Sequence, residues 1–271
     1  MDPALMKLFD SHCHLHDERL RPILPAVFER ARTAGVAGML NCGCTEADWP
    51  EVQALATARP EIIPAYGLHP WYLGERSACW RDTLARLLES DPRAAVGEVG
   101  LDHALEERND AEQRAVFLDS LALARDFRRP VSVHCRRAWA ALIECLGRVG
   151  QLPAGLVIHS YSGSVELVEP LARSGARFSF SGSITYPANR RGRRAAAAVP
   201  LELLLVETDS PDIPPYFGDK SDGGKKEAEP LNEPANLPLV IRTIAGIRGM
   251  TPEALAQRVW ENSRELFGLD R

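Results

Sequence analysis

The chain has 271 residues, 45% hydrophobic content and a formal net charge of −5 at pH 7. This acidity argues against a protein that coats nucleic acid non-specifically, but it leaves room for a nuclease with local positive charge at its cleft. There is no run of roughly 18 apolar residues and no basic, then apolar leader at Met1–Lys7, so we expect a cytoplasmic protein without a membrane span.

Short apolar runs alternate with amphipathic stretches along the chain, which predicts strands alternating with helices. The predicted strands are Lys7–Asp10, Val36–Asn41, Ile62–Tyr66, Ala94–Glu98, Val131–His134, Leu156–His159, Arg177–Ser181 and Leu203–Glu207. The predicted helices are Ile23–Ala34, Glu46–Ala58, Trp80–Glu89, Asp110–Phe127, Ala138–Val149, Ser164–Ser174, Ala188–Ala198, Pro234–Ile247 and Pro252–Phe267.

Eight such repeats favour an α/β fold, a closed (β/α)₈ TIM barrel formed as a single domain over residues 1–271. An open doubly wound sheet is the alternative. It would usually carry a glycine-rich phosphate-binding turn after the first strand, where this chain has Ser11-His12-Cys13-His14. We expect a functional site at the carboxyl-terminal mouth of the strands.

The first predicted strand ends in the pair His12 and His14. Residues two apart on a strand lie on the same face, so both imidazoles can hold one metal ion while Cys13 points away. Cys42 and Cys44 form the only close cysteine pair, and no second pair completes a zinc site. We interpret them as core and loop thiols.

Four more ligand-type residues follow later strands. Glu98 ends the fourth, His134 the fifth, His159 the sixth, and Asp209 follows the eighth. The carboxyl ends of barrel strands meet at one mouth, so these side chains should share a small volume. Buried imidazoles and carboxylates need a partner for their charge and lone pairs, and a metal supplies one.

This donor set exceeds what one tetrahedral ion requires. We predict two divalent ions, with His12, His14 and Asp209 on the first and His134 and His159 on the second. Glu98 would bridge them. Imidazole ligands suit Zn, whereas carboxylate and water positions suit Mg or Mn.

The order of these motifs resembles the TatD family of metal-dependent deoxyribonucleases, within the amidohydrolase superfamily. The matching segments include Asp10–His14, Gly67–Pro70, Gly97–Asp102, Val133–Arg136, His159–Ser164, Glu207–Pro211, Asn232–Asn236 and Glu261–Phe267. The resemblance implies a TIM barrel, divalent metals and phosphodiester hydrolysis. It also implies His12, His14, Glu98, His134, His159 and Asp209 as metal ligands. The chain departs from the family pattern at Ser160-Tyr161, where Cys-Phe is usual.

The resemblance leads us to expect a 3′-to-5′ exodeoxyribonuclease acting on DNA, monomeric, with two ions that are Mg or Mn, or Zn as the alternative. We expect Glu98 and Asp209 to be catalytic as well as metal-binding, with Asp209 accepting a proton from the attacking water. His69 is predicted to contact phosphate or transfer a proton. Arg136 and Ser162 are predicted to bind substrate.

Other features leave alternatives open. Trp71 and Tyr72 follow His69-Pro70 and either stack a base or pack against their loop. The irregular stretch Pro211–Asn232 is either a cover over the barrel mouth or a solvated loop.

The same metal site would also serve another ester hydrolase, such as a D-aminoacyl-tRNA deacylase. A non-catalytic metal-binding interaction module is the alternative of another class.

Overall fold

The computed structural model describes residues 6–218 and 231–269. Eight parallel strands form one sheet, in which each strand pairs with the next along the chain. They are β1 Leu8–Cys13, β2 Val36–Cys42, β3 Ile62–Tyr66, β4 Ala95–Asp102, β5 Val131–Arg136, β6 Leu156–Ile158, β7 Ala176–Phe180 and β8 Leu204–Val206.

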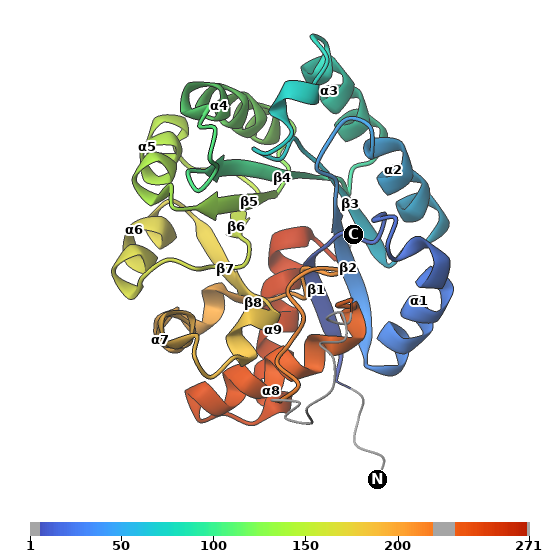
Figure 1. The fold of residues 1–271 in the computed structure, drawn as a ribbon, viewed down its shortest axis with the longest axis vertical. Coiled ribbons are helices and arrows are strands. Elements are labelled where there is room, and N and C mark those ends of the chain that lie inside the picture. Colours follow the sequence, from blue (N-terminus) through green and yellow to red (C-terminus); the bar gives the residue numbers. More distant parts are fainter. Residues whose placement is uncertain (1–5, 219–230, 270–271) are drawn as a thin grey trace.

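The α-helices of the described ranges lie around the strands, as Figure 1 shows. They are α1 Leu24–Thr33, α2 Trp49–Ala58, α3 Trp80–Ser90, α4 Asp110–Asp126, α5 Trp139–Val149, α6 Val168–Arg173, α7 Arg190–Ala198, α8 Leu237–Arg248 and α9 Pro252–Phe267. The predicted TIM-barrel architecture is confirmed, and each predicted strand overlaps an observed one.

The last strand meets the first at the carboxyl-terminal mouth of the barrel. Ser11 Oγ donates to the Val206 carbonyl oxygen at 2.9 Å, and the Asp209 N–H donates to the His12 carbonyl oxygen at 3.0 Å. The Asp10 carboxylate also accepts from the Thr208 N–H at 2.9 Å. These bonds hold the segment after β8 against the end of β1, so Asp209 lies beside His12.

The barrel interior below the mouth is apolar. Inward-facing residues of the strands pack with the end of α9, where the rings of Phe9 and Phe267 stack with centroids 5.1 Å apart. Thr251 caps the start of α9, because its side chain accepts from the Ala254 N–H, and the helix ends before Gly268, which has a left-handed conformation. α9 therefore carries Phe267 to the amino-terminal end of the barrel and seals it.

Two strands lose regular alternation around a candidate ligand, His12 in β1 and Glu98 in β4. In β1 the register shifts between Asp10 and Cys13, and in β4 it shifts between Val96 and Val99. Such irregularities re-aim side chains and occur next to active sites. Leu8 and Val96 point away from the barrel interior, into the apolar cluster that the strands form with the helices. If side chains alternated strictly from these two residues, His12 and Glu98 would also point away from the interior.

Within the described ranges, no helix combines the length and apolar character needed to cross a membrane. Of the irregular stretch predicted at 211–232, residues 219–230 lie outside the described part of the chain.

Candidate active site

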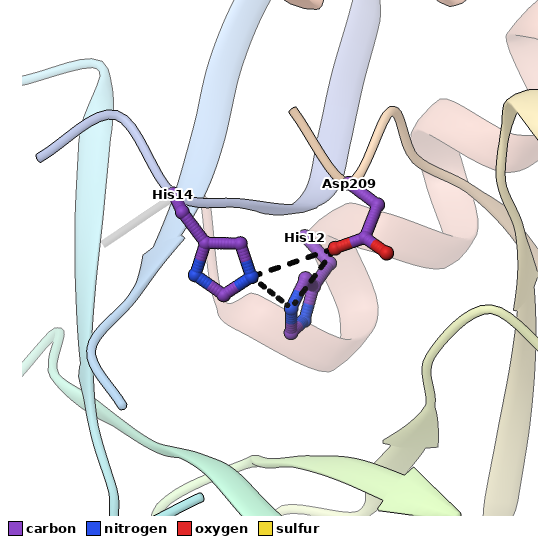
Figure 2. A group of neighbouring side chains, drawn as sticks. All are labelled: His12, His14 and Asp209. Atoms are coloured by element: carbon purple, nitrogen blue, oxygen red, sulfur yellow. Dashed lines mark hydrogen bonds and ion pairs between the residues drawn. The ribbon is translucent and has the colours of Figure 1, made fainter. Parts of the chain in front are cut away.

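The side chains of His12, His14 and Asp209 converge at the mouth (Figure 2). The two Nε2 atoms lie 3.2 Å apart, and Asp209 Oδ1 lies 3.7 Å from that of His12 and 3.4 Å from that of His14. Asp209 has a φ of 61°, a conformation uncommon for a residue other than glycine. This turn of the backbone places its carboxylate over the histidine pair.

His134 and His159 form a second pair beside the first. His134 Nδ1 lies 3.2 Å from His159 Nε2, and the rings of His12 and His159 stack with centroids 4.0 Å apart. Gly100 on β4 pairs with His134 and lets β5 approach closely: a Cβ at Gly100 would lie 1.9 Å from the His134 carbonyl oxygen. A glycine is therefore required next to this candidate ligand.

Glu98 lies between the two pairs and turns one oxygen toward each. Oε2 is 3.3 Å from His12 Nε2 and 3.5 Å from His14 Nε2. Oε1 is 2.9 Å from His134 Nδ1 and 2.8 Å from His159 Nε2. Burial alone would raise the pKa of Glu98, but the surrounding histidines, His159 first, lower that pKa well below its usual value. The carboxylate is therefore ionised between two imidazole pairs.

In each histidine ring, the partner of the nitrogen that faces away from the centre shows whether the other nitrogen is free to bind an ion. His14 Nδ1 lies 2.8 Å from the Cys42 carbonyl oxygen, which only accepts, so Nδ1 carries the hydrogen. His134 Nε2 likewise faces Asp102 Oδ2 at 3.3 Å. Both rings thus present an unprotonated nitrogen to the centre when neutral, the arrangement of metal-ligating histidines.

The donor set fits divalent metal ions. Four groups of three donor atoms, each within 4.8 Å of one another, are present: His12, His14 and Asp209; His12, Glu98 and His159; His14, Cys44 and Glu98; and His69, Glu98 and His134. Inward-facing lone pairs at such separations repel unless protons or cations lie between them. Burial lowers the pKa of His159, but Glu98 and Glu207 outweigh it and raise that pKa well above its usual value.

His69 is held differently from the other four histidines. Its Nδ1 accepts the backbone N–H of Trp71 at 3.2 Å, so the hydrogen is on Nε2, which faces Glu98 Oε1 at 3.3 Å. Burial lowers the pKa of His69 to about 4, so the ring is neutral near pH 7. His69 therefore presents a donor to the centre, whereas the other rings can present lone pairs.

A cleft of about 940 Å³ opens above these residues. Arg136 and Ser162, predicted to bind substrate, both line it and are exposed. Two further arginines line the opposite side and are already paired: Arg19 with Asp17 and Asp212, and Arg21 with Glu51. Of the three arginines that line the cleft, Arg136 alone has no ion pair with another described residue, so its guanidinium is available to an anion.

Comparison with known proteins agrees with this geometry. A family model described as "TatD related DNase" matches residues 9–268. The chain belongs to the TatD family. The predicted family is confirmed, and with it the assignment of the chain as a hydrolytic enzyme of the nuclease class.

Full-length relatives support the TatD assignment. The chain is 32% identical to a 3′-5′ ssDNA/RNA exonuclease TatD of Erwinia billingiae over 97% of this chain and 99% of the relative. It is 31% identical to YjjV of Escherichia coli, an uncharacterised metal-dependent hydrolase, over 98% of this chain and 99% of the relative. Together with the donor groups, these relatives support divalent metal ions as cofactors.

Solved structures share the whole barrel. The crystal structure of the YjjV TatD homologue matches with a TM-score of 0.89 at 30% identity, covering 97% of this chain and 99% of that one. A TatD-family hydrolase from Entamoeba histolytica matches with a TM-score of 0.83 at 20% identity, covering 96% and 98%. The second match supports the fold alone.

Two residues at this TatD site had no role in the sequence-based interpretation. Cys44, interpreted as a core or loop thiol, lines the cleft with Sγ 3.8 Å from Glu98 Oε2. Asp102 Oδ2 accepts from Trp71 Nε1 at 2.7 Å as well as facing His134. A signal was present for both, because Cys44 and Asp102 lie three and four residues past the ends of predicted strands, on the side of the mouth.

Proposed function

We propose that this chain hydrolyses phosphodiester bonds of DNA, working from the 3′ end of a strand with two divalent ions. The observation that carries the proposal is the position of Glu98, with one carboxylate oxygen toward each histidine pair. A carboxylate placed in this way would help to hold two divalent ions, one beside each histidine pair. The enzyme would act as a single-domain monomer in the cytoplasm.

Each half of the site has the donors for one ion. His12, His14 and Asp209 would hold the first ion, and His134 and His159 the second, with Glu98 common to both. Divalent ions supply Lewis acidity, since they lower the pKa of water and stabilise negative charge on phosphate. We propose Mg²⁺ or Mn²⁺ as the working ions and Zn²⁺ as the alternative, given the mixed imidazole and carboxylate donors.

The remaining steps fall to protein side chains. Burial would raise the pKa of Asp209, but His14 and its neighbours lower it to about 2, so this carboxylate is ionised and can accept a proton from the attacking water. The His69 Nε2–H would donate to a phosphate oxygen. Arg136 would pair with a phosphate, and the Ser162 hydroxyl would hydrogen-bond to the substrate from the same rim of the cleft.

The test combines metal removal with substrate choice. Purified protein treated with excess EDTA should lose turnover of a 5′-labelled single-stranded oligonucleotide, and added Mn²⁺ or Mg²⁺ should restore it. Products shortened one nucleotide at a time would support 3′-to-5′ action. Unchanged turnover in EDTA, or hydrolysis of a charged tRNA ester with none of DNA, would overturn the proposal.

A further inference from the structure

Trp71 has an unusual position for a large apolar side chain. It lies on the loop that follows β3, next to the candidate metal ligands. It lines the cleft, and 49% of its surface is exposed. Its ring centroid is 6.4 Å from that of His134 and 5.0 Å from that of His69. A half-exposed indole this close to a reaction centre leaves apolar surface in contact with water that a ligand can cover.

The indole is fixed in place before any substrate arrives. Its Nε1–H donates to Asp102 Oδ2 at 2.7 Å, and its backbone N–H donates to His69 Nδ1 at 3.2 Å. The loop itself is held by the His69 N–H, which donates to the Cys44 carbonyl oxygen at 2.9 Å. Because the ring is already ordered, a partner that stacks on it loses little of the binding free energy to side-chain ordering.

We propose that Trp71 is a stacking platform for one of the two bases that flank the scissile phosphate. This inference rests on the proposed nuclease function. A nucleobase matches the flat apolar face of an indole, and stacking tolerates any sequence because every base has a π face. A base inside a duplex is already stacked, so the platform favours unpaired strands over paired ones.

The arrangement also explains why the platform lies where it does. Asp102 fixes the indole with the same oxygen that faces His134, so the base and the candidate metal ligand are positioned by one carboxylate. A base seated on Trp71 would therefore have its phosphate close to the metal donors. Substrate binding and alignment of the phosphate would be coupled through a single rigid unit.

The test crosses a change in the protein with a change in the DNA. Trp71→Ala should lower kcat/KM on single-stranded oligonucleotides about 10- to 100-fold, the size expected for one lost base stack. Placing an abasic nucleotide at one of the last two positions, which flank the scissile phosphate, should lower wild-type turnover by a similar factor. On the strand that lacks this base, Trp71→Ala should be no slower than the wild-type enzyme.

Two further variants separate stacking from a merely structural role. Trp71→Phe keeps a ring but loses the bond to Asp102, so it should retain most of the preference for an intact base. Ile23→Ala removes another exposed apolar side chain, one that does not line the cleft, and should change nothing. Quenching of tryptophan fluorescence by a phosphorothioate strand should also disappear in Trp71→Ala.

The outcomes distinguish the two proposals. If Trp71→Ala lowers turnover equally on intact and abasic strands, or leaves it unchanged, the stacking platform is wrong and the nuclease function stands. If the metal-loaded wild-type enzyme hydrolyses no strand of either kind, the proposed function itself fails and the platform fails with it.

Discussion

At its amino-terminal end the barrel interior is filled with apolar side chains, whereas at its carboxyl-terminal end the same strands present imidazoles and carboxylates. Phe9, Leu40, Ile63, Val157 and Leu205 pack at the lower level, and α9 closes it from below. At the upper level, Glu98 and Asp209 are buried among histidines. One set of strands thus changes from core to site within a few residues.

The difference between the two ends shows how the fold stays stable with buried polar groups at its mouth. Buried carboxylates and imidazoles cost desolvation free energy, which the apolar lower level offsets. In TIM barrels the carboxyl-terminal mouth carries the chemistry and the opposite end carries stability. Substitutions at the two ends should therefore have separable consequences.

The largest effect should come from the upper end. Glu98→Gln keeps the size of the side chain but removes the charge that both histidine pairs share. We expect the hydrolysis rate to fall by at least about 10²- to 10³-fold, the scale of losing one preorganised electrostatic group. Circular dichroism should show the fold unchanged.

Glu61→Gln is the matched control, because Glu61 lies by the amino-terminal end of the strands and is paired with Arg59 at the surface. It should leave the rate near that of wild type. A Glu98→Gln rate within a few-fold of wild type would remove Glu98 from the bridging role.

Phe267→Ala should have the opposite profile. It removes a ring that stacks on Phe9 and seals the barrel, so the free energy of unfolding should fall by about 3–5 kcal/mol. The kcat of the folded enzyme at low temperature should not change, since this ring lies at the end opposite the cleft. Urea unfolding and steady-state kinetics on the same preparation measure both. A large loss of kcat in fully folded protein would break the comparison between the ends.

Asp102→Asn tests how the upper end is ordered. Asp102 Oδ2 accepts from Trp71 and faces His134, while Oδ1 accepts the Ala104 N–H. An amide has only one oxygen, so one of these donors would meet an NH₂ group. We expect metal affinity, measured by titration calorimetry, to fall about 10- to 100-fold. The exposed Asp82→Asn should leave the affinity unchanged, and an unchanged affinity in Asp102→Asn would show that Asp102 does not orient His134.

Metal binding at the upper end should also release protons. Burial lowers the pKa of His14 and of His159, but neighbouring groups outweigh it, Cys44 first for His14 and Glu98 first for His159, and raise both. A raised pKa means that the metal-free rings hold protons near neutral pH, whereas a ligand must be unprotonated. Metal binding should therefore release protons and strengthen by about tenfold per pH unit for each proton released. Calorimetry in buffers of different ionisation enthalpy would contradict this if the heat did not depend on the buffer.

The regular strands explain how far the sequence could predict this site. On β5 and β6, strict alternation already directs His134 and His159 inward, after Ser132 and Val157. The same alternation fails on β1 and β4, where register shifts re-aim His12 and Glu98. The orientation of the Asp209 carboxylate depends on the left-handed backbone conformation of this residue, which follows β8.

The positions of the candidate ligands along the chain could therefore be predicted, because they follow apolar runs that end at one mouth. Their orientation on β1, β4 and β8 could not, because local irregularities set by neighbouring strands decide it. Cys44 was missed for a related reason. Its pairing with Cys42 suggested a thiol site or none, while its place after β2 is what brings it to the cleft.

The smallest effect should distinguish the two rims of the upper end. Arg136→Gln removes a guanidinium that has no ion pair among the described residues, whereas Arg21→Gln removes one already paired with Glu51. If Arg136 contacts a phosphate, its loss should raise KM a few-fold and reduce the salt dependence of single-strand binding, the slope of log K against log salt, by about 0.7. Arg21→Gln should leave that slope nearly unchanged, because its charge is already neutralised. Equal slopes for both variants and wild type would mean that the strand does not cross the β5 rim, and the path of the substrate would have to be sought on the side of β1.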